Sequence, residues 1–118
     1  MPLEAVVAEE IQRDTPQARL EAFADLFRRN PHAWRALWSK AREMAWRNHY
    51  VCSDYLMHWL RFDSHLLPAG STHGVRMPNT YATILGRYLR EDEGLRPYVR
   101  VTKSMYDGLE LPEIGGTR

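Results

Sequence analysis

Five histidines are the side chains of this 118-residue chain that could do metal chemistry. No two of them stand four residues apart, and no H-E-x-x-H sequence is present. His65 and His73 share one expected loop, Asp63 lies beside them, and together they offer the nitrogen and oxygen ligands that zinc takes. Loop histidines are far more often solvated surface residues. We therefore expect no metal site and no cofactor.

Cys52 is the single cysteine, and with a histidine as its base it could act as a nucleophile. Its position between Val51 and Ser53 is more typical of a small buried apolar side chain. The stretch from Gly70 to Gly74 lacks the Gly-Lys-Ser/Thr ending of a phosphate-binding loop. The sequence therefore predicts that the protein is not an enzyme.

The sequence also bears on where the protein works. Its first residues lack the basic-then-apolar order of a signal peptide. Its apolar runs stay well below the roughly 20 residues of a membrane span, and a single cysteine excludes an intrachain disulfide framework. We expect a cytoplasmic protein with no membrane partner.

Charge is distributed unevenly along the chain. Residues 1–27 hold two basic and six acidic side chains, residues 28–106 hold thirteen and six, and residues 107–118 hold one and three. A basic middle without compensation suggests a polyanion as partner. The alternative is that an acidic end folds back onto the basic body.

The spacing of apolar residues predicts a mainly helical chain with a small β element. Thr15-Pro16 and Asn30-Pro31 each place a capping residue before a proline, which is typical of helix starts. An irregular stretch is expected at 64–77. Apolar side chains recur at helical intervals in four segments, and short β-like patterns occur in two more. We expect helices at about 16–29, 32–48, 53–63 and 79–91, and strands at 50–52 and 98–103.

This order of elements resembles a winged helix-turn-helix in a single domain. We divide the chain into an acidic amphipathic arm (1–14), a helical winged-helix-like domain (15–106) and a loose acidic tail (107–118). The roughly fourteen residues between the third and fourth helices speak against the motif, because its turn usually has three or four residues.

Within this hypothesis, helix 79–91 is the recognition helix and enters the major groove of double-stranded DNA. Strand 98–103 belongs to the wing, whose basic residues contact backbone phosphates. The protein is then a small DNA-binding or DNA-associated regulator. The side chains expected to contact DNA are Thr80, Thr83, Arg87, Arg90, Arg100 and Lys103.

The alternative is a protein-interaction module, for which one of the four tryptophans is a candidate contact. Trp34, Trp38 and Trp59 lie on apolar helix faces and are expected in the core. Trp46 falls near the edge of its apolar face, beside Arg47. Tryptophan and arginine are favoured in binding hot spots, so Trp46 is the candidate partner-binding residue. The acidic arm offers a second contact.

The segment from Phe27 to Ser104 is similar to a group of small, uncharacterised phage and prophage proteins. The resemblance covers about two thirds of the chain, and its short motifs are of modest specificity. A run of asparagines in that group is reduced here to Asn79. The resemblance implies a phage origin and a compact helical fold, and it implies no activity. With a phage origin, the partner of the protein-interaction module is expected to be a host or phage protein. The matching residues are Phe27, Asn30-Pro31, Trp34, Ser53, Arg61-Phe62, Pro78-Asn79-Thr80-Tyr81, Arg87 and the stretch 98–103.

Overall fold

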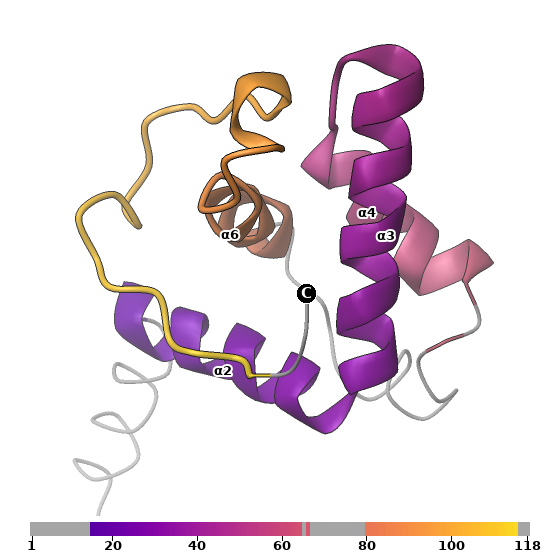
Figure 1. The fold of residues 1–118 in the computed structure, drawn as a ribbon. Coiled ribbons are helices and arrows are strands. Elements are labelled where there is room, and N and C mark those ends of the chain that lie inside the picture. The colour runs from indigo at the N-terminus through magenta and orange to yellow at the C-terminus, as the bar shows by residue number, and fades with distance from the viewer. Residues whose placement is uncertain (1–14, 65, 67–79, 116–118) are drawn as a thin grey trace, which may run out of the picture.

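The structure, a computed structural model, describes residues 15–64, 66 and 80–115. Three helices, α2, α3 and α6, surround the core, and α4 lies behind α3 in the view of Figure 1. The arm 1–14 and most of the irregular stretch 64–77 lie outside the described residues. The elements are α2 (Pro16–Arg29), α3 (Pro31–Asn48), α4 (Ser53–His58), the π-helix η1 (Trp59–Asp63), α6 (Thr80–Leu89) and the 3₁₀-helix η2 (Arg96–Tyr98).

The first two helices begin where the sequence predicts. The Thr15 hydroxyl accepts a hydrogen bond from the backbone N–H of Ala18 at 3.1 Å, and Pro16 occupies the first helical position. Asn30 separates α2 from α3, and its Nδ2 donates to the carbonyl of Leu26 at 2.8 Å. This bond satisfies a carbonyl in the last turn of α2 that has no partner within the helix.

Aromatic side chains from three helices make the centre of the core. Phe23 and Phe27 of α2 have ring centroids 4.8 Å apart. Trp34 of α3 lies 5.0 Å from Phe27 and 5.4 Å from Tyr88 of α6. Edge-to-face and tilted pairs of this kind stabilise beyond their buried area. The cluster therefore fixes α2, α3 and α6 against one another.

Helix α6 is the central element of the fold, because seven of its ten residues are buried. It packs against α4 and α2, and the segment after η2 crosses its remaining side. Gly86 allows the closest approach: a Cβ at this position would lie 3.1 Å from both the Ser53 hydroxyl and Val101 Cγ1. A Cβ here would force the Ser53 and Val101 side chains to shift by a few tenths of an ångström.

The predicted winged helix is wrong, although the fold is mainly helical. Within residues 15–64, 66 and 80–115 there is no sheet, and a single parallel bridge joins Val51 to Val99. The Val51 N–H donates to the carbonyl of Tyr98 at 2.9 Å. Pro97 lies inside η2, which turns the chain where a wing strand would start. Val99 is buried, so the alternating pattern reflects packing on the helices without a partner strand.

The C-terminal segment differs from the expected loose tail as far as residue 115. Arg28 donates from Nε and from a terminal nitrogen to the carbonyl of Glu113, at 2.8 and 2.6 Å. The Tyr88 hydroxyl donates to the carbonyl of Pro112. Leu111 and Ile114 are half-buried against the core. Backbone carbonyls and apolar side chains thus attach residues 111–114 to α2 and α6 despite the acidic composition.

Candidate nucleic-acid interface

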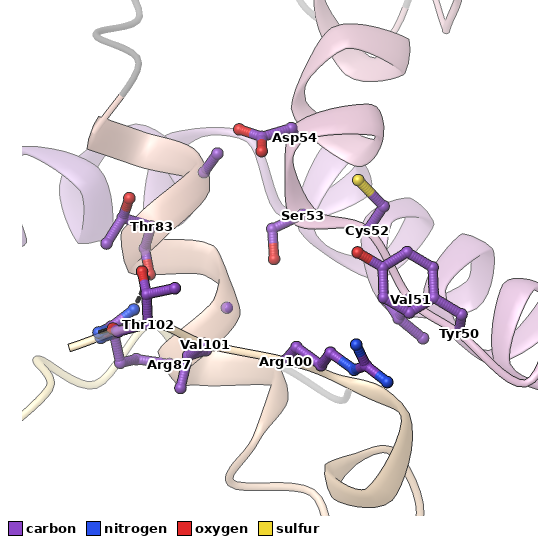
Figure 2. A pocket seen from close by; sticks show the side chains of 12 residues that line it. Tyr50, Val51, Cys52, Ser53, Asp54, Thr83, Arg87, Arg100, Val101 and Thr102 are labelled. Atoms are coloured by element: carbon purple, nitrogen blue, oxygen red, sulfur yellow. Dashed lines mark hydrogen bonds between the residues drawn. The ribbon is translucent and has the colours of Figure 1, made fainter. Parts of the chain in front are cut away.

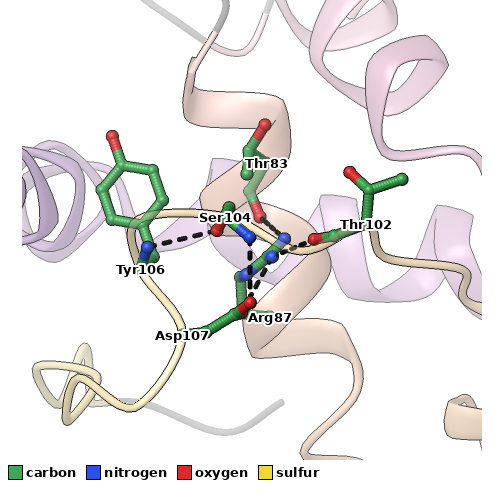
Figure 3. A network of polar contacts seen from close by, with 6 residues as sticks. All are labelled: Thr83, Arg87, Thr102, Ser104, Tyr106 and Asp107. Atoms are coloured by element: carbon green, nitrogen blue, oxygen red, sulfur yellow. Dashed lines mark hydrogen bonds and ion pairs between the residues drawn. The ribbon is translucent and has the colours of Figure 1, made fainter.

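The predicted recognition residues on α6 do not form an exposed face. Thr80 and Thr83 are half-buried, and the Arg87 side chain is only 11% exposed. Arg87 donates to the carbonyl of Thr83 at 3.1 Å, to the carbonyl of Thr102, and to Asp107 Oδ1 at 3.0 Å (Figure 3). A recognition helix needs a free polar face to enter a groove. On α6 that face is covered by the segment 102–107.

The other predicted contacts, Arg90, Arg100 and Lys103, are exposed. Arg100 lies beside Tyr50, at one end of a cavity of about 170 Å³ between α4, α6 and the segment 100–102 (Figure 2). Thr83 and Arg87 line the same cavity from the α6 side. The structure thus brings Thr83, Arg87 and Arg100 around one small cavity, not along a helix face that DNA could follow.

Asp107 closes the network around Arg87. Its Oδ2 accepts a hydrogen bond from the backbone N–H of Ser104 at 2.9 Å, and its Oδ1 accepts from Arg87. The Ser104 N–H, followed by the Arg87 guanidinium, lowers the pKa of the Asp107 carboxyl below its ordinary value. Folding therefore favours the ionised form of this carboxyl.

We expect the Asp107→Asn variant to be less stable than the wild type at neutral pH and to approach it in acid. A carboxyl whose pKa is lowered by folding contributes stability above its unfolded pKa, about 3.9. That contribution disappears as pH falls through the folded pKa. The free energies of unfolding of both proteins, measured in urea from pH 7 to pH 3, check this. A difference that stays constant over the whole range would contradict the prediction.

One face of α3 presents basic and aromatic side chains in line, and we call it the α3 stripe. Its six residues are all exposed and follow one another at intervals of three and four, which places them on one side of the helix. None is a carboxylate. The α3 stripe consists of His32, Arg35, Ser39, Arg42, Trp46 and His49.

The two arginines of the α3 stripe lack acidic partners. Arg35 donates to His32 Nδ1 at 2.6 Å, and Arg42 lies over the Trp38 ring, 5.8 Å from its centroid. In the described ranges neither forms an ion pair with a carboxylate. On the next face of α3, by contrast, Lys40 and Arg47 share Glu43. Neither guanidinium of the α3 stripe is therefore held by a carboxylate of the described residues.

Trp46 extends the α3 stripe with an indole that is 83% exposed. Trp34 and Trp38 of the same helix are 2% and 0% exposed, which confirms their predicted place in the core. Next to Trp46 lies a hollow of about 350 Å³, and we call it the Trp46 hollow. It is lined by Arg42, Ala45, Trp46, His49, Asp92, Gly94, Leu95 and Tyr98.

The α3 stripe can be seen in the sequence, but the predicted set of nucleic-acid contacts does not include it. The spacing of Arg35, Ser39, Arg42 and Trp46 places them on one helix face, next to the face that carries the buried tryptophans. The winged-helix order of elements instead predicts the binding surface on α6. Trp46 is the one residue of the α3 stripe that the sequence predicts as a partner contact, and the structure places it on an exposed surface.

The structure also bears on the metal and membrane hypotheses. Among the described residues, no three histidine, cysteine or acidic side chains gather where they could hold a metal ion. Of the loop candidates, Asp63 is described, whereas His65 and His73 lie outside the described residues. In the described part of the chain, the helices are too short or too polar to cross a membrane.

The chain gave no match to protein-family models, to curated proteins or to solved structures. The resemblance to small phage proteins therefore stays a prediction, based on motifs such as Asn30-Pro31 and Arg61-Phe62. Function has to be inferred from the α3 stripe and the Trp46 hollow.

Proposed function

We propose that this protein binds nucleic acid through the α3 stripe. The observation that carries the proposal is the exposed face of α3 on which Arg35 and Arg42 have no acidic partner in the described ranges. The two guanidinium groups are seven residues apart, or about 10 Å along the helix axis. A polyanion with regularly spaced phosphates offers both of them a partner at once.

Arginine suits this role because its planar guanidinium donates two parallel hydrogen bonds to phosphate oxygens. Exposed guanidinium groups without a bound carboxylate have no protein ion pair to break before they meet a phosphate. His32 and His49, at the two ends of the stripe, add further hydrogen-bond donors to phosphate or base edges. Phosphate contacts then supply affinity without requiring a particular sequence.

Binding of a protein partner through Trp46 is the competing explanation. An exposed indole serves either partner, so Trp46 alone does not separate them. The two explanations differ in whether the partner also contacts Arg35, which lies eleven residues, or about 16 Å along the helix axis, from Trp46. A nucleic acid carries a phosphate at every nucleotide, so its negative charge spans that distance. A protein partner would need acidic side chains placed at matching intervals.

The proposal retains a small DNA-associated regulator of the phage type that works in the cytoplasm, with no enzymatic activity. It moves the contact surface from α6 to α3. The support for this move is the burial of the polar face of α6, where Arg87 bonds to two carbonyls and a carboxylate. Binding through α3 leaves that network intact.

The double variant Arg35→Glu plus Arg42→Glu tests the proposal. We expect wild-type affinity for labelled random-sequence DNA to fall steeply between about 50 and 200 mM salt, as phosphate contacts require. We expect the double variant to bind at least about tenfold more weakly at the lower salt, because two attractions become repulsions. Fluorescence anisotropy with duplex and single-stranded DNA measures both effects.

Arg90→Glu plus Arg100→Glu is the matched control, since it makes the same change in net charge at exposed arginines outside the α3 stripe. We expect this control to keep most of the affinity. Equal losses in the two double variants would show that net charge, not the α3 stripe, governs binding. Wild-type protein that binds neither DNA at about 50 mM salt would refute nucleic-acid binding.

A further inference from the structure

The most exposed large apolar side chain in the described part of the molecule belongs to the α3 stripe, next to its last residue, His49. Trp46 is 83% exposed, against 59% for Phe62 and 58% for Met105. It lies in the last turn of α3, which ends at Asn48 and is followed by His49 in a left-handed conformation with a φ of 53°. A flat aromatic surface of this size is left open to solvent on the same face as Arg35 and Arg42, neither of which pairs with a carboxylate in the described ranges.

The Trp46 hollow gives that indole an apolar floor and a second aromatic wall. Ala45 and Leu95 are buried beneath it, at 7% and 3% exposure. Tyr98 and His49 form an aromatic pair with ring centroids 6.0 Å apart. The hollow therefore offers a flat ligand both an apolar base and aromatic edges, next to the open face of Trp46.

The charges around the Trp46 hollow determine on which side an anionic group of a ligand would lie. Arg42 stands one helical turn before Trp46, about 6 Å along the axis, on the α3 wall. Asp92 belongs to the other wall, formed by residues 92–98, and its Oδ1 accepts hydrogen bonds from the backbone N–H groups of Gly94 and Leu95 at 2.8 and 3.3 Å. An anionic group is thus favoured on the α3 side of the hollow and disfavoured on the other.

A nucleotide fits this arrangement, because it joins a flat aromatic base to a phosphate. Stacking on an indole accepts any base, since each has a π face, and contributes strongly to single-strand binding. In a duplex both faces of a base are covered by its neighbours. The hollow can therefore accept only a base that is not stacked within a duplex.

Resting on the proposed function, we infer that the Trp46 hollow holds an unpaired base of a nucleic-acid strand whose phosphates follow the α3 stripe. The protein then binds single-stranded DNA more tightly than duplex DNA of the same length. Trp46 provides the stacking surface, and Arg42 holds the phosphate next to the stacked base. Arg35 holds a phosphate further along the strand.

Three DNA probes of about twelve nucleotides, within the span of known single-strand sites, test the inference. They are an oligothymidylate strand, its duplex with oligoadenylate, and an abasic strand that carries the same phosphates without bases. We expect the wild type to prefer oligothymidylate to both other probes. We expect Trp46→Ala to bind oligothymidylate about five- to 150-fold more weakly, the range measured for loss of one stacked base.

Two further variants control for side effects of the substitution. Trp46→Phe keeps a smaller ring and should recover much of the lost affinity. Phe62→Ala removes another exposed aromatic side chain, on η1, and should leave affinity unchanged. Affinity of Trp46→Ala for the abasic strand should equal that of the wild type, because the phosphate contacts remain.

The outcomes separate this inference from the proposed function. If binding depends on Arg35 and Arg42 but Trp46→Ala binds oligothymidylate as the wild type does, the inference fails and the function stands. An equal loss on the abasic strand also overturns it, because Trp46 would then act without a base. A tighter wild-type complex with the duplex contradicts it as well. If the wild type binds none of the probes, both the proposed function and the inference fail.

Discussion

Replacing Trp34 with alanine is expected to lower the free energy of unfolding by about 3–5 kcal/mol. The side chain is 2% exposed. Its ring centroid lies 5.0–6.0 Å from those of four other rings in the core: Phe23, Phe27, Trp38 and Tyr88. The substitution leaves a cavity at the point where α2, α3 and α6 meet. A loss of this size is a large part of the roughly 5–15 kcal/mol that stabilise a typical domain. Urea unfolding followed by circular dichroism measures it.

Trp46→Ala is the matched control, since it makes the same change of side chain on the same helix. Trp46 is 83% exposed, so we expect a change in unfolding free energy within about 0.5 kcal/mol. Trp34→Phe should lie between the two, because it keeps an aromatic ring at the centre of the core. Similar losses for Trp34→Ala and Trp46→Ala would show that Trp46 is also part of the core, and would remove the basis for a site there.

The helices that the sequence predicts best are those whose signals are local. Thr15-Pro16 starts α2, because the capping hydroxyl and the proline fix the backbone of the first turn. Pro31 likewise occupies the first turn of α3, although the Asn30 side chain makes no capping hydrogen bond there and bonds to Leu26 of α2 instead. The apolar spacing of Trp34 and Trp38 puts both on the buried face of α3. Such features depend on side chains a few residues apart, so a single sequence contains them.

The wing was mispredicted because a strand requires a partner that local sequence does not identify. Residues 98–103 alternate apolar and polar side chains, and Val99 is buried while Val101 is half-buried. Their backbone has one bridge, to Val51, in place of a ladder. Alternating apolar and polar residues indicate that one side of an extended chain is buried. They do not indicate whether a strand or a set of helices covers that side.

The same limit explains the choice of α6 as recognition helix. Thr80, Thr83 and Arg87 do share one polar face, as their spacing predicts. That face is covered by residues 102–107, which are about fifteen to twenty positions further along the chain. Helical periodicity shows which side of a helix is polar, whereas exposure depends on distant segments. On α3, no such segment covers the stripe that contains Arg35 and Arg42 in the described structure.

Arg87→Met is expected to lower the free energy of unfolding by about 2–3 kcal/mol, because it removes a nearly buried guanidinium that bonds to two backbone carbonyls. Methionine keeps most of the side-chain volume, so the loss reports the polar contacts rather than a cavity. Asp107→Asn, which retains Arg87 and both carbonyl bonds, should lose less. If the two single variants lose the same amount and the double variant no more, then the link between Arg87 and Asp107 carries the whole effect. If Arg87→Met leaves stability unchanged, Arg87 does not hold segment 102–107 on α6. The argument that this face is closed to DNA would then fail, and the predicted contacts on α6 would again be the first surface to test.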